Sequence, residues 1–256
     1  MFPDLINLGP VTLHTYGLFL ALGLLAGLMV TWRIREREGI DSRQVLEMAL
    51  LMILAGVIGS RGLYVFMNMS QYRNRPMDIL KIWEGGFVFA GGIICVFSII
   101  ALYARRRRLS FFKLGDLWAP AVAIGQGIGR IGCFFAGCCY GMPTDLKWGV
   151  VFTNPHSLAP LNVALHPTQL YSAASGFAIF IVLLLLHSKK KFEGQVLLWF
   201  LILHSTARLA IERFRGDERG VLLSGNMTTT QLAATVILMA AVITLFFVKA
   251  KRSEQA

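Results

Sequence analysis

Residues 125–141 read GQGIGRIGCFFAGCCYG. The stretch has the apolar character of the outer half of a membrane helix, yet it carries a full positive charge at Arg130 and six glycines. It also holds three of the chain's four cysteines. An arginine inside an apolar span costs about 2.5–3.5 kcal/mol on insertion scales, so such a residue indicates a functional site.

The composition of the 256-residue chain indicates a protein that crosses a membrane several times. Hydrophobic residues make up 55% of the chain and charged residues only 15%, whereas a soluble domain carries about 25% charged residues. The formal net charge of +11 comes largely from short basic clusters between apolar stretches. Lipid headgroups and the insertion machinery recognise positive charge in such places. We therefore expect the lipid bilayer, and not nucleic acid, as the partner of these clusters.

Seven apolar stretches have about the 20 residues that a helix needs to cross a bilayer. Backbone polar groups in lipid must pair within their own segment, so we predict an all-α integral membrane protein with a single membrane domain over residues 1–256. Pro120 and the many glycines lower the hydropathy of the fourth stretch. The predicted transmembrane helices cover residues 14–33, 46–67, 86–104, 115–136, 169–187, 194–214 and 228–248.

Positive charge alternates between the segments that join these stretches. Fifteen of the 25 Lys and Arg residues follow the first, third, fifth and seventh stretches. The positive-inside rule places those four segments in the cytoplasm, so we predict the N-terminus outside and the C-terminus inside. The odd number of stretches agrees with this arrangement, because it puts the two termini on opposite sides of the membrane. The residues counted are Arg33, Arg35, Arg37, Arg43, Arg105 to Arg108, Lys113, Lys189 to Lys191, Lys249, Lys251 and Arg252.

The longest loop lies on the predicted outer side, at residues 137–168. It holds four prolines and Trp148, and it is too long for a simple turn. We predict that it forms a small extracytoplasmic cap between the fourth and fifth helices. The alternating run from Trp148 to Phe152 is compatible with a short strand in this cap.

Unusual polar residues and glycines gather in the outer halves of the predicted helices. The inner halves carry charge mainly at their rims. This distribution predicts one polar, arginine-rich cavity on the extracytoplasmic side. The outer residues are Tyr16, Arg61, Gly91, Gly92, Arg130, His166, Gln169, Arg208, Glu212 and Arg215.

Several of these residues also have a purely structural interpretation. Arg208 and Glu212 are four residues apart and can pair on one helix face. Arg61 and Arg213 lie near helix ends and can extend to the headgroups. The glycines can serve close helix packing, and the GxGxxG spacing at residues 127–132 has no preceding strand that would make it a dinucleotide site.

The cysteines allow three interpretations. Cys133, Cys138 and Cys139 could bind a metal with His166, but the spacing C-x4-CC is poor for zinc, so we expect no metal and no soluble cofactor. Buried cysteine usually packs as a small hydrophobic residue, and on the outer face Cys138 or Cys139 could form a disulfide. His204, like the remaining histidines, has no partner that the sequence reveals.

The segment GRIGCFFAGCCYG at residues 129–141 resembles the signature of the prolipoprotein diacylglyceryl transferases, bacterial enzymes that begin lipoprotein modification. Further segments resemble the same family in the same order, so the resemblance covers nearly the whole chain. They are TYG at 15–17, GSRGLYV at 59–65, GGFVFAGG at 85–92, GDLWAP at 115–120, HPTQLY at 166–171 and RLAIERFR at 208–215.

The resemblance implies a reaction in the bacterial inner membrane, on its extracytoplasmic side. The diacylglyceryl group of phosphatidylglycerol is transferred to the lipobox cysteine thiol of a preprolipoprotein signal peptide, which forms a thioether and releases glycerol phosphate. Arg130 and Arg208 match the family's two central arginines and are expected to grip the phosphate. Glu212 is expected to orient Arg208 or Arg215. The expected phosphatidylglycerol-binding set is Arg130, Arg208, Tyr16, Arg61, His166, Gln169, Arg215, Gly91, Gly92 and Gly141.

The chain departs from the family pattern at three positions. Many members have a histidine, proposed as a base, where this chain has Ala90, so His166 and Glu212 are the candidate replacements. Cys133 and Cys138 stand where Asn and Glu are frequent. These departures leave two alternative functions open. One is an inactive paralogue, and the other is a phospholipid-binding or transport protein that releases its lipid unchanged.

Overall fold

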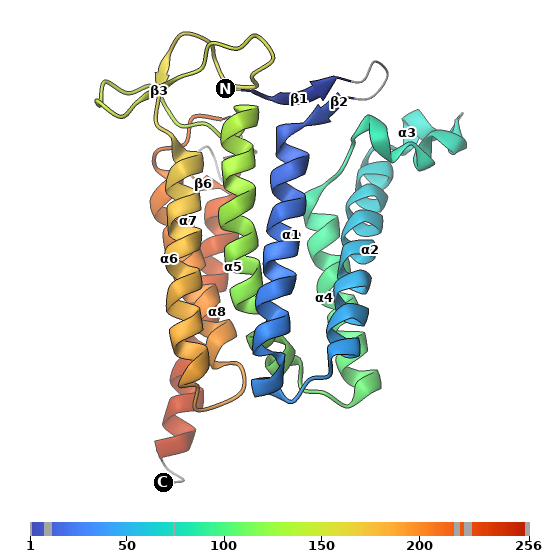
Figure 1. Cartoon of the computed structure of the whole chain (residues 1–256), viewed down its shortest axis with the longest axis vertical. Helices are drawn as coiled ribbons and strands as arrows, with labels where there is room; N and C mark the ends of the chain where they lie inside the picture. The colour runs from blue at the N-terminus through green and yellow to red at the C-terminus, as the bar shows by residue number, and fades with distance from the viewer. Residues whose placement is uncertain (1, 8–11, 74, 218–220, 223–226, 254–256) are drawn as a thin grey trace. The chain divides into compact units, whose positions relative to one another are not determined.

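The computed structural model describes residues 2–7, 12–73, 75–217, 221–222 and 227–253, and most of them are helical (Figure 1). A helix occupies each of the seven apolar stretches, and α5 runs without interruption through Pro120. The helices are α1 (Thr15–Ile34), α2 (Ser42–Met67), α4 (Phe89–Arg107), α5 (Phe111–Ala136), α6 (Thr168–Ser188), α7 (Gln195–Glu212) and α8 (Thr229–Ser253).

The short elements lie between and before these helices. Three two-stranded antiparallel pairs form, β1 with β2, β3 with β4, and β5 with β6. In the second pair Val150 lies opposite Leu165, so a strand does form inside the predicted Trp148–Phe152 run. The short elements are β1 (Asp4–Asn7), β2 (Thr12–His14), η1 (Arg35–Glu38), α3 (Met69–Tyr72), η2 (Pro76–Leu80), η3 (Ile82–Glu84), β3 (Val150–Val151), β4 (Ala164–Leu165), β5 (Val221–Leu222) and β6 (Met227–Thr228).

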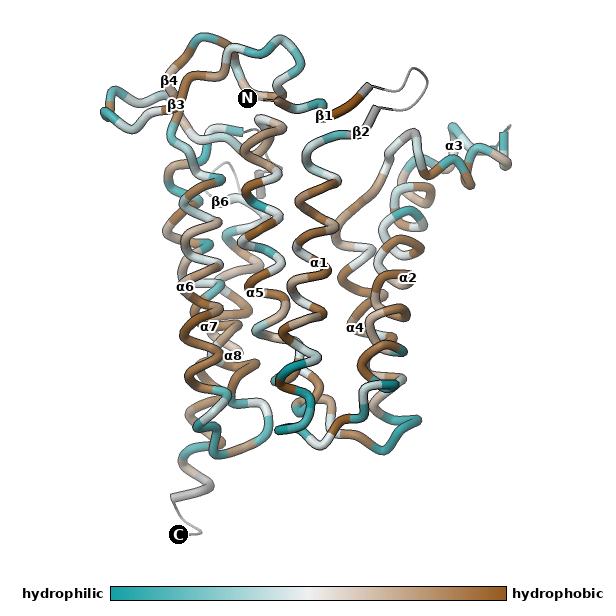
Figure 2. Tube along the Cα trace, in the orientation of Figure 1, coloured by the Kyte–Doolittle hydropathy of each residue, from teal (hydrophilic) through white to brown (hydrophobic). Residues whose placement is uncertain are grey.

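The helix surfaces are those of a membrane protein. Figure 2 shows hydrophobic residues along the middle of the helices and hydrophilic residues near their ends. Large apolar side chains such as Leu24, Ile58 and Phe246 are exposed along these middles, which is the arrangement that lipid contact favours. Six helices of the described chain are long and apolar enough to cross a membrane. The exception is the 18-residue α7, whose C-terminal half carries His204, Arg208 and Glu212.

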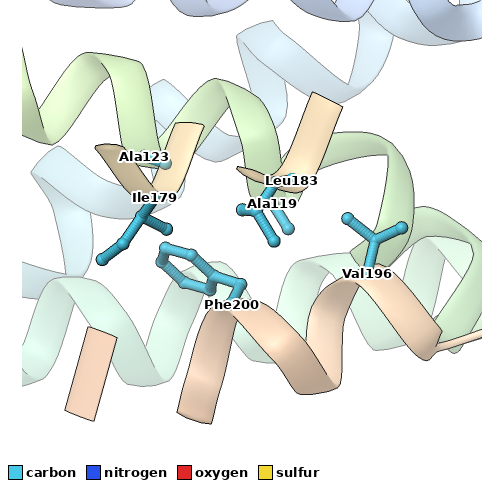
Figure 3. Close-up of a cluster of buried hydrophobic side chains, with 6 residues drawn as sticks. All are labelled: Ala119, Ala123, Ile179, Leu183, Val196 and Phe200. Atoms are coloured by element: carbon cyan, nitrogen blue, oxygen red, sulfur yellow. The ribbon is translucent and has the colours of Figure 1, made fainter. Parts of the chain in front are cut away.

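The chain forms two compact units, residues 1–31 with 115–256 and residues 32–114. The core of the first unit is built on small residues of α5. Ala119 and Ala123 are buried against Ile179 and Leu183 of α6 and against Val196 and Phe200 of α7 (Figure 3). Because alanine takes little space, α6 and α7 can both approach α5, which fixes the three helices that carry most of the polar residues.

Asp116 of α5 fixes the start of α7. Its carboxylate is fully buried and accepts hydrogen bonds from the backbone N–H groups of Gly194 (2.7 Å) and Leu197 (2.9 Å) and from Lys190 Nζ (3.3 Å). The first N–H groups of a helix lack partners within the helix and attract negative charge. A side chain from another helix therefore caps α7 and sets its position along α5.

In the second unit, α2 and α4 cross at glycines. A Cβ atom on Gly59 would lie 2.5 Å from the carbonyl oxygen of Gly91, and one on Gly92 would lie 3.1 Å from that of Gly56. The two backbones are thus in direct contact, as small residues in membrane helices permit. Gly91 and Gly92 serve this crossing, which agrees with the structural interpretation of these glycines.

Candidate active site

Arg130 lies in the last third of α5 and is half-buried. Among the described residues, no side chain or carbonyl forms a hydrogen bond or ion pair with its guanidinium. Its charge acts electrostatically on Tyr16, Cys133 and His204. Space beside it comes from Gly129, where an added Cβ would have no neighbour within 4 Å. A half-buried cation without a protein counter-ion is suited to an anionic ligand.

Arg208 and Glu212 form an ion pair one turn apart on α7. Arg208 NH2 lies 2.7 Å from Glu212 Oε2, and the two side chains are 13% and 3% exposed. Glu212 Oε1 also accepts a hydrogen bond from Thr228 Oγ1 at 3.1 Å. The expectation that these residues pair on one helix face is therefore correct, and Thr228 connects the pair to the start of α8.

His204 is the residue that the sequence did not single out. It lies one turn before Arg208 on α7, and its ring stacks on Phe200 with centroids 5.5 Å apart. Both Arg130 and Arg208 act electrostatically on its imidazole. The charges of two arginines on different helices therefore both act on His204. The only sequence signal for a role of His204 is that it lies four residues before Arg208.

Arg215 has a carboxylate partner of its own. Its Nε and NH2 atoms donate to the two carboxylate oxygens of Asp217 at 2.8 and 2.7 Å, a bidentate pair. Of the two arginines that Glu212 was expected to orient, the ion pair assigns it to Arg208. The buried Arg215 side chain lies beside the Cys139 thiol instead.

The three cysteines of the signature segment come together where α5 ends. Gly137, with a φ of 76°, turns the chain, and Cys139 adopts the left-handed region at 62°, where non-glycine residues are uncommon. This double turn folds the chain back, so the Sγ atoms of Cys133, Cys138 and Cys139 all lie within 4.8 Å of one another. The pKa of Cys139 lies well below its usual range, because the other two thiols donate toward its sulfur and the Arg215 and Arg130 charges add to their effect.

Two buried polar side chains at the start of α6 hold this turn. Gln169 Nε2 donates to the Cys138 carbonyl at 2.9 Å, and Thr168 Oγ1 donates to the Cys139 carbonyl at 2.8 Å. Both side chains are completely buried. Gln169 therefore uses its amide nitrogen to position the cysteines, while its Oε1 atom has no hydrogen-bond partner among the described residues.

Gly141 lies where three chain segments cross. Its N–H donates to the His166 carbonyl at 3.0 Å, it pairs with Arg215, and an added Cβ would lie 2.5 Å from His166 Cβ. His166 Nδ1 lies 3.3 Å from the Tyr171 hydroxyl, which also accepts a hydrogen bond from Trp148 Nε1 at 2.9 Å. Gly141 and His166 thus join the cap to the ends of α6 and α7.

Arg61 belongs to the second unit and is occupied by backbone carbonyls. Its Nε donates to Ile79, NH1 to Gly85 and Gly86, and NH2 to Asp78 and Lys81, at 2.6–3.3 Å. A guanidinium has five N–H donors, and these contacts use all of them. The buried Arg61 therefore organises the loop at residues 78–86 and keeps no donor for a headgroup.

The structure thus places eight of the predicted site residues in the first unit, at the N-terminal ends of α1 and α6 and toward the C-terminal ends of α5 and α7. They are Tyr16, Arg130, Gly141, His166, Gln169, Arg208, Glu212 and Arg215. Arg61, Gly91 and Gly92 belong to the second unit, as does Ala90.

Comparison with known proteins identifies the family of the chain. The sequence profile of the prolipoprotein diacylglyceryl transferases matches residues 3–247. A phosphatidylglycerol–prolipoprotein diacylglyceryl transferase of Clostridium tetani is 38% identical over 220 residues, which cover 86% of this chain and 88% of the relative. The enzyme of the same name from Bordetella avium is 32% identical and covers 99% of this chain and 96% of the relative. Because the match runs through all seven helices and both arginine-bearing segments, the chain belongs to the prolipoprotein diacylglyceryl transferase family.

Proposed function

We propose that this chain transfers the diacylglyceryl group of phosphatidylglycerol to the lipobox cysteine thiol of preprolipoproteins, the first step of bacterial lipoprotein biogenesis. Membership of the family and the names of its relatives support this transferase activity. The observation that carries the placement of the site is Arg130. It is a half-buried cation on α5, it has no counter-ion among the described side chains, and its charge acts on His204, as the charge of Arg208 does.

The reaction places negative charge where the two arginines can meet it. The thiolate sulfur attacks the glycerol carbon that bears the phosphate, and the bond between this carbon and the phosphate oxygen breaks. The electron pair stays on the phosphate oxygen, so the products are a thioether and glycerol phosphate. Guanidinium groups bind phosphate oxygens bidentately and stabilise charge strongly where water is excluded. Arg130 and Arg208 would thus bind the headgroup and stabilise the departing phosphate.

The remaining residues have supporting roles in this proposal. Glu212 orients Arg208 through their ion pair. Tyr16 faces the Arg130 charge and is partly exposed, so its hydroxyl is available to the headgroup. Gln169, Arg215 and Gly141 shape the wall of the site through the contacts described above, and we no longer assign Arg61 to the headgroup. With Ala90 in place of the family histidine, His166 and Glu212 remain the candidate bases.

The topology of the proposal has seven transmembrane helices. Arg208, His204 and Glu212 lower the mean hydropathy of α7. The helix nevertheless packs against both α6 and α8. We place the N-terminus and the cap outside and the basic segments in the cytoplasm, as the positive-inside rule requires. The arginines then face the extracytoplasmic side of the bacterial inner membrane.

The test is transfer of labelled phosphatidylglycerol to a lipobox peptide by the purified chain in detergent micelles. We expect wild type to form the thioether and Arg130→Lys to lose on the order of 100-fold in rate, because a point charge cannot replace a planar fork. Arg213→Ala is the matched control, since Arg213 is exposed at the end of the same α7 region. Normal transfer by Arg130→Lys would contradict bidentate phosphate binding at this position.

The same preparation separates the alternatives. Binding of phosphatidylglycerol without any thioether product would favour the inactive paralogue or the binding and transport protein. A comparison with Ala90→His tests the missing histidine directly. Faster transfer by this variant would show that its absence limits the reaction.

A further inference from the structure

Cys133, Cys138 and Cys139 are close enough to react with one another, and they differ in their exposure. Their Sγ atoms all lie within 4.8 Å of one another, and the three residues are free thiols. Cys133 is buried in the last turn of α5, whereas Cys138 and Cys139 are half-buried in the turn that follows. An oxidant from outside therefore meets Cys138 and Cys139 first, and the buried Cys133 sulfur is within reach of both.

We propose that Cys139 is a site of oxidative modification, at which a peroxide oxidises the sulfur and Cys133 then closes a disulfide with it. The site and its disulfide follow from the cluster alone, whereas an effect on lipid transfer rests on the proposed transferase function. The cluster would thus respond to oxidants on the extracytoplasmic side, where disulfides persist.

Cys139 has the surroundings of a reactive thiol. The Cys133 and Cys138 thiols donate toward its sulfur, and this lowers the pKa of Cys139 well below its usual range. The positive charges of Arg215 and Arg130 add to the effect. Peroxides oxidise the thiolate, so a low pKa together with exposure makes a cysteine reactive. A second cysteine beside the reactive one is typical of redox-sensitive sites.

Arg215 is positioned to stabilise an anionic sulfur at Cys139. Its Nε and NH2 atoms donate to Asp217, whereas its buried NH1 atom has no hydrogen-bond partner among the described residues. The guanidinium lies beside the Cys139 sulfur. Its remaining N–H groups are therefore available for a charge-assisted hydrogen bond to a thiolate or a sulfenate at this position.

Cys133 is a better partner for the disulfide than Cys138. Consecutive Cα atoms are about 3.8 Å apart across a trans peptide, whereas disulfides join Cα atoms that are about 4.4–6.8 Å apart. A disulfide between the neighbours Cys138 and Cys139 is therefore strained. Cys133 lies six residues before Cys139 in the chain, so its disulfide is free of this restriction.

The backbone keeps Cys139 in place for this reaction. The residue lies in the left-handed region with a φ of 62°, and Thr168 Oγ1 donates to its carbonyl at 2.8 Å. Gln169 Nε2 holds the neighbouring Cys138 carbonyl at 2.9 Å. Both supporting side chains are completely buried. Because these contacts keep the sulfurs together before oxidation, the disulfide closes within one chain and needs no second protein.

The chemistry takes two steps. The Cys139 thiolate attacks one oxygen of hydrogen peroxide, the O–O bond breaks, and the products are a sulfenic acid and hydroxide. The hydroxide takes up the proton that Cys139 released when it ionised. The Cys133 sulfur then attacks the sulfenic sulfur, the S–O bond breaks, and the oxygen leaves as water with the Cys133 proton. Two thiols are thus oxidised to one disulfide, and the peroxide is reduced to two waters.

Oxidation removes a negative charge from the neighbourhood of the site arginines. The Cys139 thiolate interacts electrostatically with Arg130, and the disulfide that replaces it is neutral. Arg130 then holds an anionic phosphate more strongly. Because phosphatidylglycerol and glycerol phosphate both carry such a phosphate, we expect a lower KM for the lipid and a lower kcat through slower product release. Each change should be on the order of fivefold, as for a typical coupling between two sites.

The first experiment maps oxidation in the full-length chain purified in detergent micelles. Hydrogen peroxide is added with dimedone, which labels sulfenic acids, and the modified peptides are identified by mass spectrometry. We expect wild type to form a disulfide between Cys133 and Cys139 that dithiothreitol opens. Wild type is decisive by itself, because oxidation of Cys139 no faster than that of Cys95, the free thiol of α4, would overturn the proposal.

Serine variants test the roles of the three cysteines. Cys133→Ser leaves the Cys139 sulfenic acid without its partner, so dimedone labelling of Cys139 should rise from a trace to most of the chains. Cys138→Ser is the matched control, because it removes an equally close thiol, and it should form the same disulfide as wild type. A disulfide that is lost in Cys138→Ser and kept in Cys133→Ser would contradict the assigned pair.

The second experiment measures transfer of labelled phosphatidylglycerol to a lipobox peptide before and after oxidation. Catalase removes the peroxide before the peptide is added, so the thiol of the peptide stays reduced. We expect KM and kcat of wild type to fall on oxidation and to recover with dithiothreitol, whereas peroxide should not change the transfer rate of Cys139→Ser. Unchanged wild-type kinetics with the disulfide fully formed would overturn the effect on the site.

The oxidation site and the transferase function can fail separately. A fully reduced chain that forms no thioether, but forms the disulfide between Cys133 and Cys139 with peroxide, would refute the transfer and keep the oxidation site. A chain that transfers the lipid when reduced, but forms no disulfide with peroxide, would keep the transferase function and refute the oxidation site.

Discussion

Arg208 and Glu212 lie one turn apart on α7, and their ion pair of 2.7 Å is almost completely shielded from solvent. The carboxylate has a second contact at Thr228 Oγ1, so it neutralises Arg208 and also fixes where its guanidinium lies. A phosphate that arrives at Arg208 therefore meets a side chain that is already oriented.

Replacement of Glu212 by Gln should be costly for both stability and transfer. The change keeps the side-chain shape but leaves the buried Arg208 charge uncompensated, and breaking a buried pair costs about 3–5 kcal/mol. We expect a lower midpoint of thermal unfolding in micelles and a raised KM for phosphatidylglycerol. Glu193→Gln is the control, because Glu193 is exposed in the loop before α7. Similar unfolding midpoints for the two variants would contradict this role of the pair.

Arg61→Lys should loosen the loop at residues 78–86. Lysine has three donors where the guanidinium uses five, so at least two buried carbonyls lose a partner at about 1–3 kcal/mol each. Faster hydrogen exchange of the loop amides is the expected result. Arg73→Lys, at an exposed position of the same unit, should leave exchange unchanged. Unaltered protection in the Arg61 variant would show that the five hydrogen bonds do not hold the loop.

The crossing of α2 and α4 can be tested with two glycines of the same helix. Gly59→Ala places a Cβ 2.5 Å from the Gly91 carbonyl oxygen, and such overpacking costs about 1–3 kcal/mol. Gly62→Ala meets no atom within 4 Å, so it should be neutral or stabilising through the better helix propensity of alanine. The unfolding midpoints of the two variants should therefore move in different directions, and equal shifts would contradict the close crossing.

Asp116→Asn should weaken the start of α7. The amide accepts less strongly than the carboxylate and loses its attraction to Lys190 and to the helix N-terminus. We expect a loss of about 1–3 kcal/mol in the free energy of unfolding and faster exchange of the Gly194 and Leu197 amides. Asp145→Asn, at an exposed cap position, serves as the control. Intact protection at both amides would exclude the capping role.

Acid should release the contact between the N-terminal hairpin and the cap. Asp4 lies 2.7 Å from His156 Nδ1 and 2.8 Å from His14 Nδ1, and the bond to His156 lowers the Asp4 pKa most. Because the pKa of Asp4 is lower in the folded state, the contact stabilises the fold at pH values above the ordinary aspartate pKa of 3.8. This stabilisation is lost as the pH falls through the lowered pKa of the folded state. Exchange of the Thr15 amide, corrected for its intrinsic pH dependence, should rise over that interval in wild type. In Asp4→Asn it should be fast already at neutral pH.

The helices were predictable because their signals are local. Length and hydropathy report membrane spans directly, and a charge such as Arg130 inside an apolar run is conspicuous at any place in the chain. The pairing of Arg208 with Glu212 was predictable for the same reason, since four residues make one helical turn. The seven helices of the structure begin and end within three residues of the predicted stretches, except that α2 and α5 each start four residues earlier and α8 ends five residues later.

The contacts between distant segments were not predictable from a single sequence. Asp116 and Gly194 are 78 residues apart, and neither carries a signal that points to the other. The meeting of the cysteines depends on the left-handed backbone of Cys139, a conformation that spacing rules do not consider. The sequence left a headgroup contact and a structural role open for Arg61, because the five carbonyls that it binds are uniform backbone groups without any sequence signature.

The glycine crossing of α2 and α4 has a mechanical consequence. With no side chain between Gly59 and Gly91, the two backbones cannot slide or separate without losing direct contact along the crossing. Arg61 of α2 donates hydrogen bonds to the loop at residues 78–86, which connects α2 with α4. Any motion within this unit should therefore carry helices α2 and α4 together, because a shift of one helix along the other would break both the backbone contact and the hydrogen bonds of Arg61.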